Sequence, residues 1–124
     1  MPSAIQILRQ EFGSSRNIMT PEIIARAKLH PAVAFELARG EGLRGSQLWG
    51  VTVAGHDGAG QTYRACQGWS QVFRSRDEAQ RHIDFVGFVC RGRDARELAS
   101  LLTDLSAIGR ARLAKWRANW QASR

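Results

Sequence analysis

Hydrophobic residues recur at helical spacing over the first third of the chain. Ile5, Leu8 and Phe12 would share one face of a short amphipathic helix that ends at Gly13. Similar spacing over residues 20–40 predicts a second helical region, after a linker rich in small and polar residues. The pattern therefore predicts that residues 1–45 are helical.

The second helical region begins with a typical helix-start signal. Thr20-Pro21-Glu22 combines an N-cap residue, a proline suited to the first helical position and an acid in the first turn. Gly40 marks the expected C-terminal end. Pro31 interrupts the region, so it either kinks there or divides into two short helices at Leu29-His30.

The period changes to two in the middle of the chain, which predicts strands. LWGVTVAG (48–55), QTYRACQGW (61–69) and SQVFRS (70–75) alternate in this way, and Asp57-Gly58 is a hairpin-turn signal. Ser75 or Asp77 would cap a helix over RDEAQRHIDFVGFV (76–89). Residues 46–90 are thus expected to form a three-stranded antiparallel sheet followed by a helix.

A long final helix is predicted from Asp94 to Ala122, with Gly109 as an internal weak point. On a continuous helix its large apolar residues form one stripe, made of Leu98, Leu101, Leu102, Leu105, Leu113, Trp116 and Trp120. The tryptophans are therefore expected to be buried against the core or a second subunit. The whole chain, residues 1–124, is predicted to be a single α+β domain.

Charge adds a functional expectation to this fold. The net charge is +7, and sixteen of the eighteen basic residues are arginine. Residues 91–124 hold eight basic and three acidic residues, a net charge of +5, whereas residues 46–90 are neutral. A positive field concentrated on one segment favours an acidic partner, and the arginine fork suits phosphate.

The candidate contacts lie mainly on the final helix. Arg110, Arg117 and Arg124 fall at heptad spacing beside the apolar stripe, and Arg112 falls within the apolar arc. The candidate nucleic-acid-binding residues are Arg110, Arg112, Lys115, Arg117 and Arg124, with Arg64 and Arg74 as second contacts from the strands.

These features predict a noncatalytic protein that binds nucleic acid, with DNA as the expected partner. The arginines would grip phosphates and carry little sequence information. The alternative is a protein-interaction module, in which the basic final helix engages an acidic protein or forms a homodimer.

Two stretches resemble known DNA-binding modules. TPEIIARAKLHPAVAFELARG, followed by GLRGSQLWGVTV, resembles a winged helix of the excisionase type, with LHP as the turn. The resemblance implies a reading helix at residues 31–40, although Glu36 and Arg39 would be its exposed charges. SQVFRSRDEAQRHI is similar to the strand and helix of AP2-type DNA-binding domains, in which the sheet reads the groove.

Catalytic and metal signals are weak. His30, His56 and His82 lack metal-ligand spacing, and His56-Asp57 fits a hairpin tip better than an acid–base pair. Cys66 and Cys90 fit buried or reduced thiols better than nucleophiles or a disulfide. We expect no enzyme activity, cofactor or metal. With no leader sequence and no long apolar run, the protein is expected to be cytoplasmic and free of the membrane.

Overall fold

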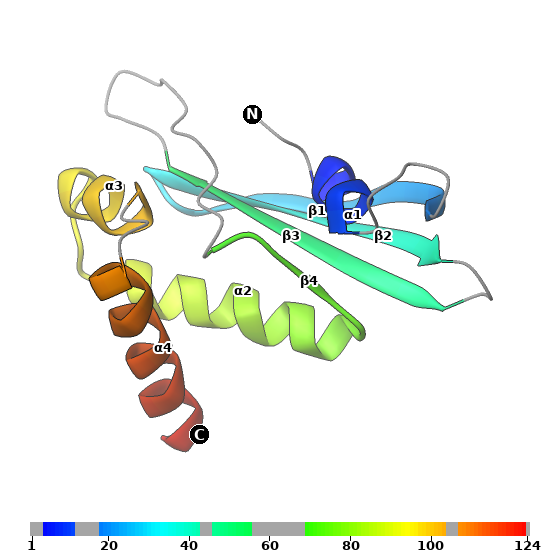
Figure 1. The fold of residues 1–124 in the computed structure, drawn as a ribbon. Coiled ribbons are helices and arrows are strands. Elements are labelled where there is room, and N and C mark those ends of the chain that lie inside the picture. The colour runs from blue at the N-terminus through cyan, green and yellow to red at the C-terminus, as the bar shows by residue number, and fades with distance from the viewer. Residues whose placement is uncertain (1–3, 12–17, 43–45, 56–68, 104–106, 124) are drawn as a thin grey trace.

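The computed structural model describes residues 4–11, 18–42, 46–55, 69–103 and 107–123 and has an α+β fold, as predicted (Figure 1). One antiparallel sheet has the order β1-β2-β3-β4, with strands β1 (Ile18–His30), β2 (Val33–Gly42), β3 (Gln47–Gly55) and β4 (Gln71–Phe73). The helices are α1 (Ala4–Glu11), α2 (Arg76–Cys90), α3 (Ala95–Thr103) and α4 (Ala107–Ala122).

Residues 20–40 are strands, so the predicted second helical region is wrong. β1 and β2 pair from Ile18 opposite Gly42 to His30 opposite Val33. The deciding pattern lies in β2, where apolar residues alternate with small or polar ones. Val33 and Leu37 belong to the buried core cluster and Phe35 packs against it, as period-two alternation requires.

The helix-start signal fails because proline is also tolerated at the edge of a sheet. β1 is an edge strand, and its pairing register shifts between Met19 and Glu22, on either side of Pro21. Pro31 and Ala32 form the turn between β1 and β2. These two strands replace the helix-turn-helix that the winged-helix resemblance implies, so that resemblance is wrong.

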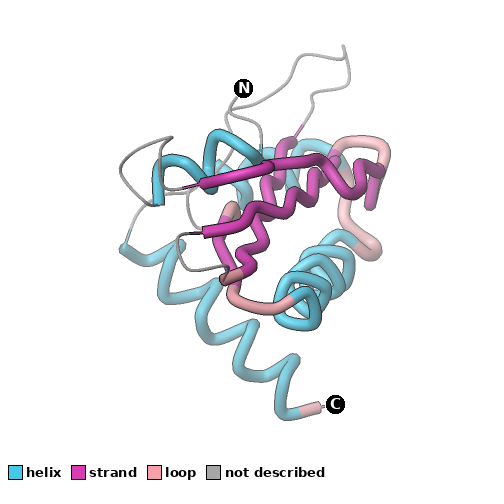
Figure 2. The backbone as a smooth tube through the Cα atoms, turned by 90° about the vertical axis from the view of Figure 1, so that its right-hand side faces the viewer, coloured by secondary structure: helices cyan, strands magenta, loops and turns pink. Residues whose placement is uncertain are grey.

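The sheet is covered on both faces, which explains why β3 is buried almost throughout. Trp49, Val51 and Val53 face the larger core, which α2 completes, whereas Leu48 belongs to a smaller cluster beneath α1. Figure 2 shows α1 on one side of the strands and α2 on the other. A Cβ atom at Gly50 would approach Leu8 Cγ to 2.9 Å, so glycine allows α1 to pack this closely.

The predicted single helix over residues 94–122 is also wrong. α3 ends at Thr103 and α4 begins at Ala107, and the two helices run in different directions (Figure 1). Apolar periodicity is present in each helix separately and does not show that the two helices share one axis. The apolar stripe predicted for one continuous helix therefore does not describe the faces of α4.

The centre of the chain agrees better with the prediction. β3 and β4 match the expected strands at residues 48–55 and 70–75, and they pair with Trp49 opposite Phe73. Ser75 is the N-cap of α2, where its Oγ accepts a hydrogen bond of 3.1 Å from the Glu78 N–H. The strand predicted at residues 61–69 lies outside the described residues except for Trp69, and the Asp57-Gly58 turn lies wholly outside them.

Candidate functional site

Helix α4 packs across the C-terminal part of α2 and presents two faces to it. On the first face, Trp116 and Trp120 are half-buried against the larger core, so their predicted burial is confirmed only in part. The Trp120 ring lies 5.6 Å from that of Phe85, and the Arg93 guanidinium lies 5.2 Å from the centre of the Trp116 ring. The outer sides of both tryptophans border open space.

That open space is a groove between α2 and α4. It consists of two adjoining hollows of about 450 and 470 Å³, which share Phe88, Arg91 and Trp120 in their walls. The Phe88 side chain is 49% exposed, which among the described residues makes it the one exposed large apolar side chain. An aromatic ring in this position is available to a partner.

Positive charge borders the groove. Arg91 is exposed at the end of α2, and Arg93 donates hydrogen bonds to the Val89 carbonyl and the Glu97 carboxylate. Arg112 is exposed and lies one helical turn before Trp116, which places it along the same face of α4.

Two further charged side chains, one acidic and one basic, lie on the same two helices. Lys115 is exposed on the flank of α4, and Asp84 on α2 contributes an acid to one wall. We call the lining residues Phe88, Arg91, Arg93, Trp116 and Trp120 the α2–α4 groove. Arg112 and Lys115 are exposed on the helix that carries the two tryptophans.

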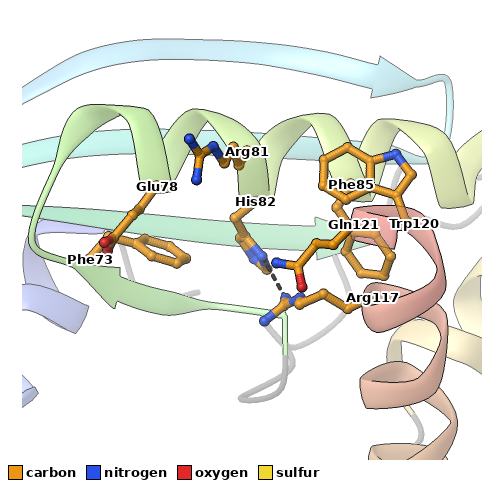
Figure 3. A pocket seen from close by; sticks show the side chains of 8 residues that line it. All are labelled: Phe73, Glu78, Arg81, His82, Phe85, Arg117, Trp120 and Gln121. Atoms are coloured by element: carbon orange, nitrogen blue, oxygen red, sulfur yellow. Dashed lines mark hydrogen bonds between the residues drawn. The ribbon is translucent and has the colours of Figure 1, made fainter. Parts of the chain in front are cut away.

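The second face of α4 points into a separate cavity of about 190 Å³ (Figure 3). There the Arg117 guanidinium donates a hydrogen bond of 2.7 Å to His82 Nδ1 and one of 3.3 Å to Gln71 Oε1. The same guanidinium lies 5.2 Å from the centre of the Phe85 ring. Arg117 is therefore half-buried and directed inward, not into solvent.

His82 is held in a single neutral form by its neighbours. Its Nε2 lies 2.7 Å from the Trp69 carbonyl and must donate a proton to it, which leaves Nδ1 to accept from Arg117. Burial lowers the pKa of His82 to about 4, and the nearby positive charge of Arg117 acts in the same direction. Desolvation also lowers the pKa of Arg117.

The structure does not show the arginine row that the sequence predicts. Arg117 faces His82, Arg112 and Lys115 are exposed on α4, and Arg74 is exposed just beyond the end of β4. The other predicted contacts are not described: Arg64 and Arg124 lie outside the described residues, as does the side chain of Arg110. Arg112 is exposed, whereas Leu113, Trp116 and Trp120 of the same helix pack against the core, so its predicted position within the apolar arc is wrong.

Phe88, Arg91 and His82 are functional candidates that the sequence analysis missed. A signal for Phe88 was present, since Phe85, Val86, Phe88 and Val89 are too many apolar residues for one stripe of a helix. The stripe buries the other three, and Phe88 is the one left facing outward.

The described residues offer little for covalent or metal chemistry. Burial raises the pKa of the free Cys90 thiol to about 11, so it is protonated at neutral pH. His30 accepts from the Ala32 N–H and binds the Arg93 carbonyl, which ties the β1–β2 turn to the end of α2. His56, Asp57 and Cys66 lie outside the described part of the chain.

Within the described ranges, no three His, Cys, Asp or Glu side chains gather as metal ligands, and no helix has the length and hydropathy to span a membrane. The chain matches no known protein family, no curated protein and no solved structure. The function is therefore inferred from the residues and their geometry alone.

Proposed function

We propose that the protein is a noncatalytic nucleic-acid-binding protein whose contact surface is the α2–α4 groove. The observation that carries the proposal is the exposed Phe88 ring, which lines a groove together with Trp116, Trp120 and arginine side chains. Proteins that bind single strands combine aromatic platforms for bases with positive charge for phosphates. The groove has both components.

The groove favours an unpaired strand over a duplex. A base can stack on Phe88 only when it is not enclosed between neighbouring base pairs. Arg91 lines the groove and is exposed, and Arg112 is exposed one helical turn before Trp116 on α4, so we expect both to be available to phosphates along a bound strand. We therefore propose single-stranded DNA or RNA as the preferred ligand, with duplex DNA bound more weakly.

Fluorescence anisotropy with a labelled 20-nucleotide single strand, the matching RNA and the duplex tests this proposal. At 50 mM salt the wild type is expected to bind both single strands more tightly than the duplex. Phe88→Ala should weaken single-strand binding about tenfold, because stacking contributes about 1–3 kcal/mol per base. Its exposure means that the substitution should leave the melting temperature almost unchanged.

A charge-matched pair of variants separates the groove from the overall charge. Arg91→Ala and Lys28→Ala each remove one positive charge from an exposed side chain, but Lys28 lies on β1, in the wall of a different hollow. Only Arg91→Ala should weaken binding. If the wild type binds none of the three nucleic acids at 50 mM salt, the proposal is wrong. A dimer that dissociates on Phe88→Ala would then favour the protein-interaction alternative.

A further inference from the structure

The cavity that contains His82 and Arg117 is distinct from the α2–α4 groove, with Trp120 contributing to the walls of both. We propose that this cavity binds a phosphate monoester group through Arg117. The proposal goes beyond nucleic-acid binding in the groove, because it assigns a second ligand site to a neighbouring face of α4.

The first argument is the uncompensated charge of Arg117. Its hydrogen-bond partners in the described part of the chain are an imidazole and an amide, both neutral. Glu78 lines the same cavity but lies toward Phe73 and forms no ion pair with Arg117 (Figure 3). Because a partly desolvated cation costs free energy unless an anion compensates it, the site favours an anionic ligand.

The second argument is the number of donors that remain. A guanidinium has five N–H donors, and His82 and Gln71 occupy one each. Nε and each terminal nitrogen therefore keep one N–H, so three donors remain for the oxygens of an anion. A phosphate has three terminal oxygens and suits separate single donors, namely Arg117, the Gln121 amide and Arg81 on the cavity wall.

The third argument is the shape of the remaining wall. Phe73 and Trp120, which are both partly exposed, supply aromatic surface beside the polar end of the cavity. This surface suits a flat group attached to the phosphate, such as a nucleobase. A free nucleotide and the phosphorylated end of a strand offer the same chemistry.

Adenosine 5′-monophosphate is the probe, with adenosine as the control that lacks phosphate. The ¹⁵N signals of the His82 ring and of Arg117 Nε report directly on the site. The nucleotide should shift these signals to saturation at millimolar concentration or below, and adenosine should not. Equal shifts from adenosine, or from acetate at the same concentration, would overturn the proposal.

Two variants test the assigned residues. Arg117→Gln should weaken nucleotide binding at least tenfold. Arg117→Gln also removes the hydrogen bond to His82, so a second variant that leaves this bond intact is needed. Glu78→Gln removes an exposed negative charge from the same cavity wall and should tighten nucleotide binding about two- to fivefold. Lys28→Ala, on the distant β1 strand, should change nothing. Unchanged affinity in both Arg117→Gln and Glu78→Gln contradicts the proposal.

Oligonucleotides that carry a 5′-phosphate or a 5′-hydroxyl distinguish the two sources of phosphate. If only the phosphorylated strand shifts the His82 signals, the cavity serves strand ends. If the nucleotide shifts them and neither strand does, the ligand is a free nucleotide. The ¹⁵N signals report on the cavity, whereas fluorescence anisotropy reports on strand binding in the groove. Failure of the phosphate proposal can therefore be distinguished from failure of the proposed nucleic-acid binding.

Discussion

His82 is a buried base whose two ring nitrogens are both used in the neutral form. Protonation would place a second positive charge beside Arg117 and would remove the acceptor that Arg117 needs. The aromatic ring of Phe73, 5.2 Å away, offers no compensating charge, and the nearest acid in the cavity wall is the exposed Glu78. The folded protein therefore strongly prefers neutral His82.

This preference makes stability depend on pH. In the unfolded chain the histidine pKa is near 6.5, whereas in the folded protein it is about 4. Between these values the unfolded chain binds more protons, so the free energy of unfolding should fall as the pH falls from 6.5 to 4. The loss attributable to His82 is about 3 kcal/mol at most. Urea unfolding at pH 4.5, 5.5 and 7 measures it.

His82→Gln is the control for this pH dependence. The variant removes the titrating ring while keeping a polar side chain beside Arg117 and the Trp69 carbonyl. Its free energy of unfolding should change less between pH 7 and 4.5 than that of the wild type. An identical pH dependence in the two proteins would assign the effect to other groups.

At the same scale, the sequence predicts a helix cap at Ser75 or Asp77, of which the structure has Ser75, and it misses the pair of His82 and Arg117. A cap is a local arrangement, since Ser75 and Glu78 are three residues apart. His82 and Arg117 are separated by 35 residues and meet only because α4 packs on α2. Hydrophobic periodicity gives neither the crossing of two helices nor the direction of an arginine side chain.

At the scale of elements, β1 and β2 show why a local signal can mislead. Thr20-Pro21-Glu22 has the composition of a helix start, yet an edge strand accommodates the same residues through a shift in register. The regular alternation in β2 indicates a strand, which is what the structure has, whereas the helix-start signal favours a helix. Where a cap signal and a period-two pattern compete, pairing with a central strand decides.

Replacing Gly50 or Gly87 by alanine should change the free energy of unfolding in opposite directions. Gly50→Ala should destabilise the protein by about 1–3 kcal/mol, because its Cβ would meet both the Ala4 carbonyl and Leu8 of α1 at 2.9 Å. Gly87→Ala, inside α2, should stabilise it by about 0.5–1 kcal/mol, since the nearest atom is 3.8 Å away. Chemical denaturation measures both changes.

Hydrogen exchange provides the more specific readout of the glycine pair. Gly50→Ala should increase exchange in α1 first, because only that helix must move away from β3. Gly87→Ala should slow exchange along α2 and leave α1 unchanged. Destabilisation by Gly87→Ala, or unchanged exchange in α1 of the Gly50→Ala protein, would contradict this account of the packing.

At the scale of the whole molecule, the described cations near the C-terminus do not share one surface. Arg91 lines the groove and Arg112 and Lys115 are exposed on α4, whereas Arg117 points into the second cavity. The sequence shows that the C-terminal segment is basic but does not reveal which of its cations line the groove and which point into the second cavity. That assignment depends on where α3 ends and on how α4 crosses α2.

The exposed cations predict how nucleic-acid binding responds to salt. Each phosphate that a protein cation neutralises on a single strand contributes about −0.7 to the slope of log K against log salt. Arg91, Arg112 and Lys115 together imply a slope of about −2, measured between 50 and 200 mM salt. Arg112→Ala combined with Lys115→Ala should make the slope shallower by about 1.4. Both side chains are exposed, so the fold should be retained.

Arg117→Gln is the control for the predicted salt slope, because Arg117 lies on α4 like Arg112 and Lys115 but points into the cavity that contains His82. Arg117→Gln removes one charge from α4, yet the salt slope for a 5′-hydroxyl strand should stay near −2, since no phosphate of that strand reaches His82. Lys28→Ala should likewise leave the slope unchanged. If all cation variants reduce the slope equally, binding follows net charge and not the groove. A wild-type slope near zero would exclude phosphate contacts altogether and leave Phe88 and the tryptophans to bind an uncharged partner.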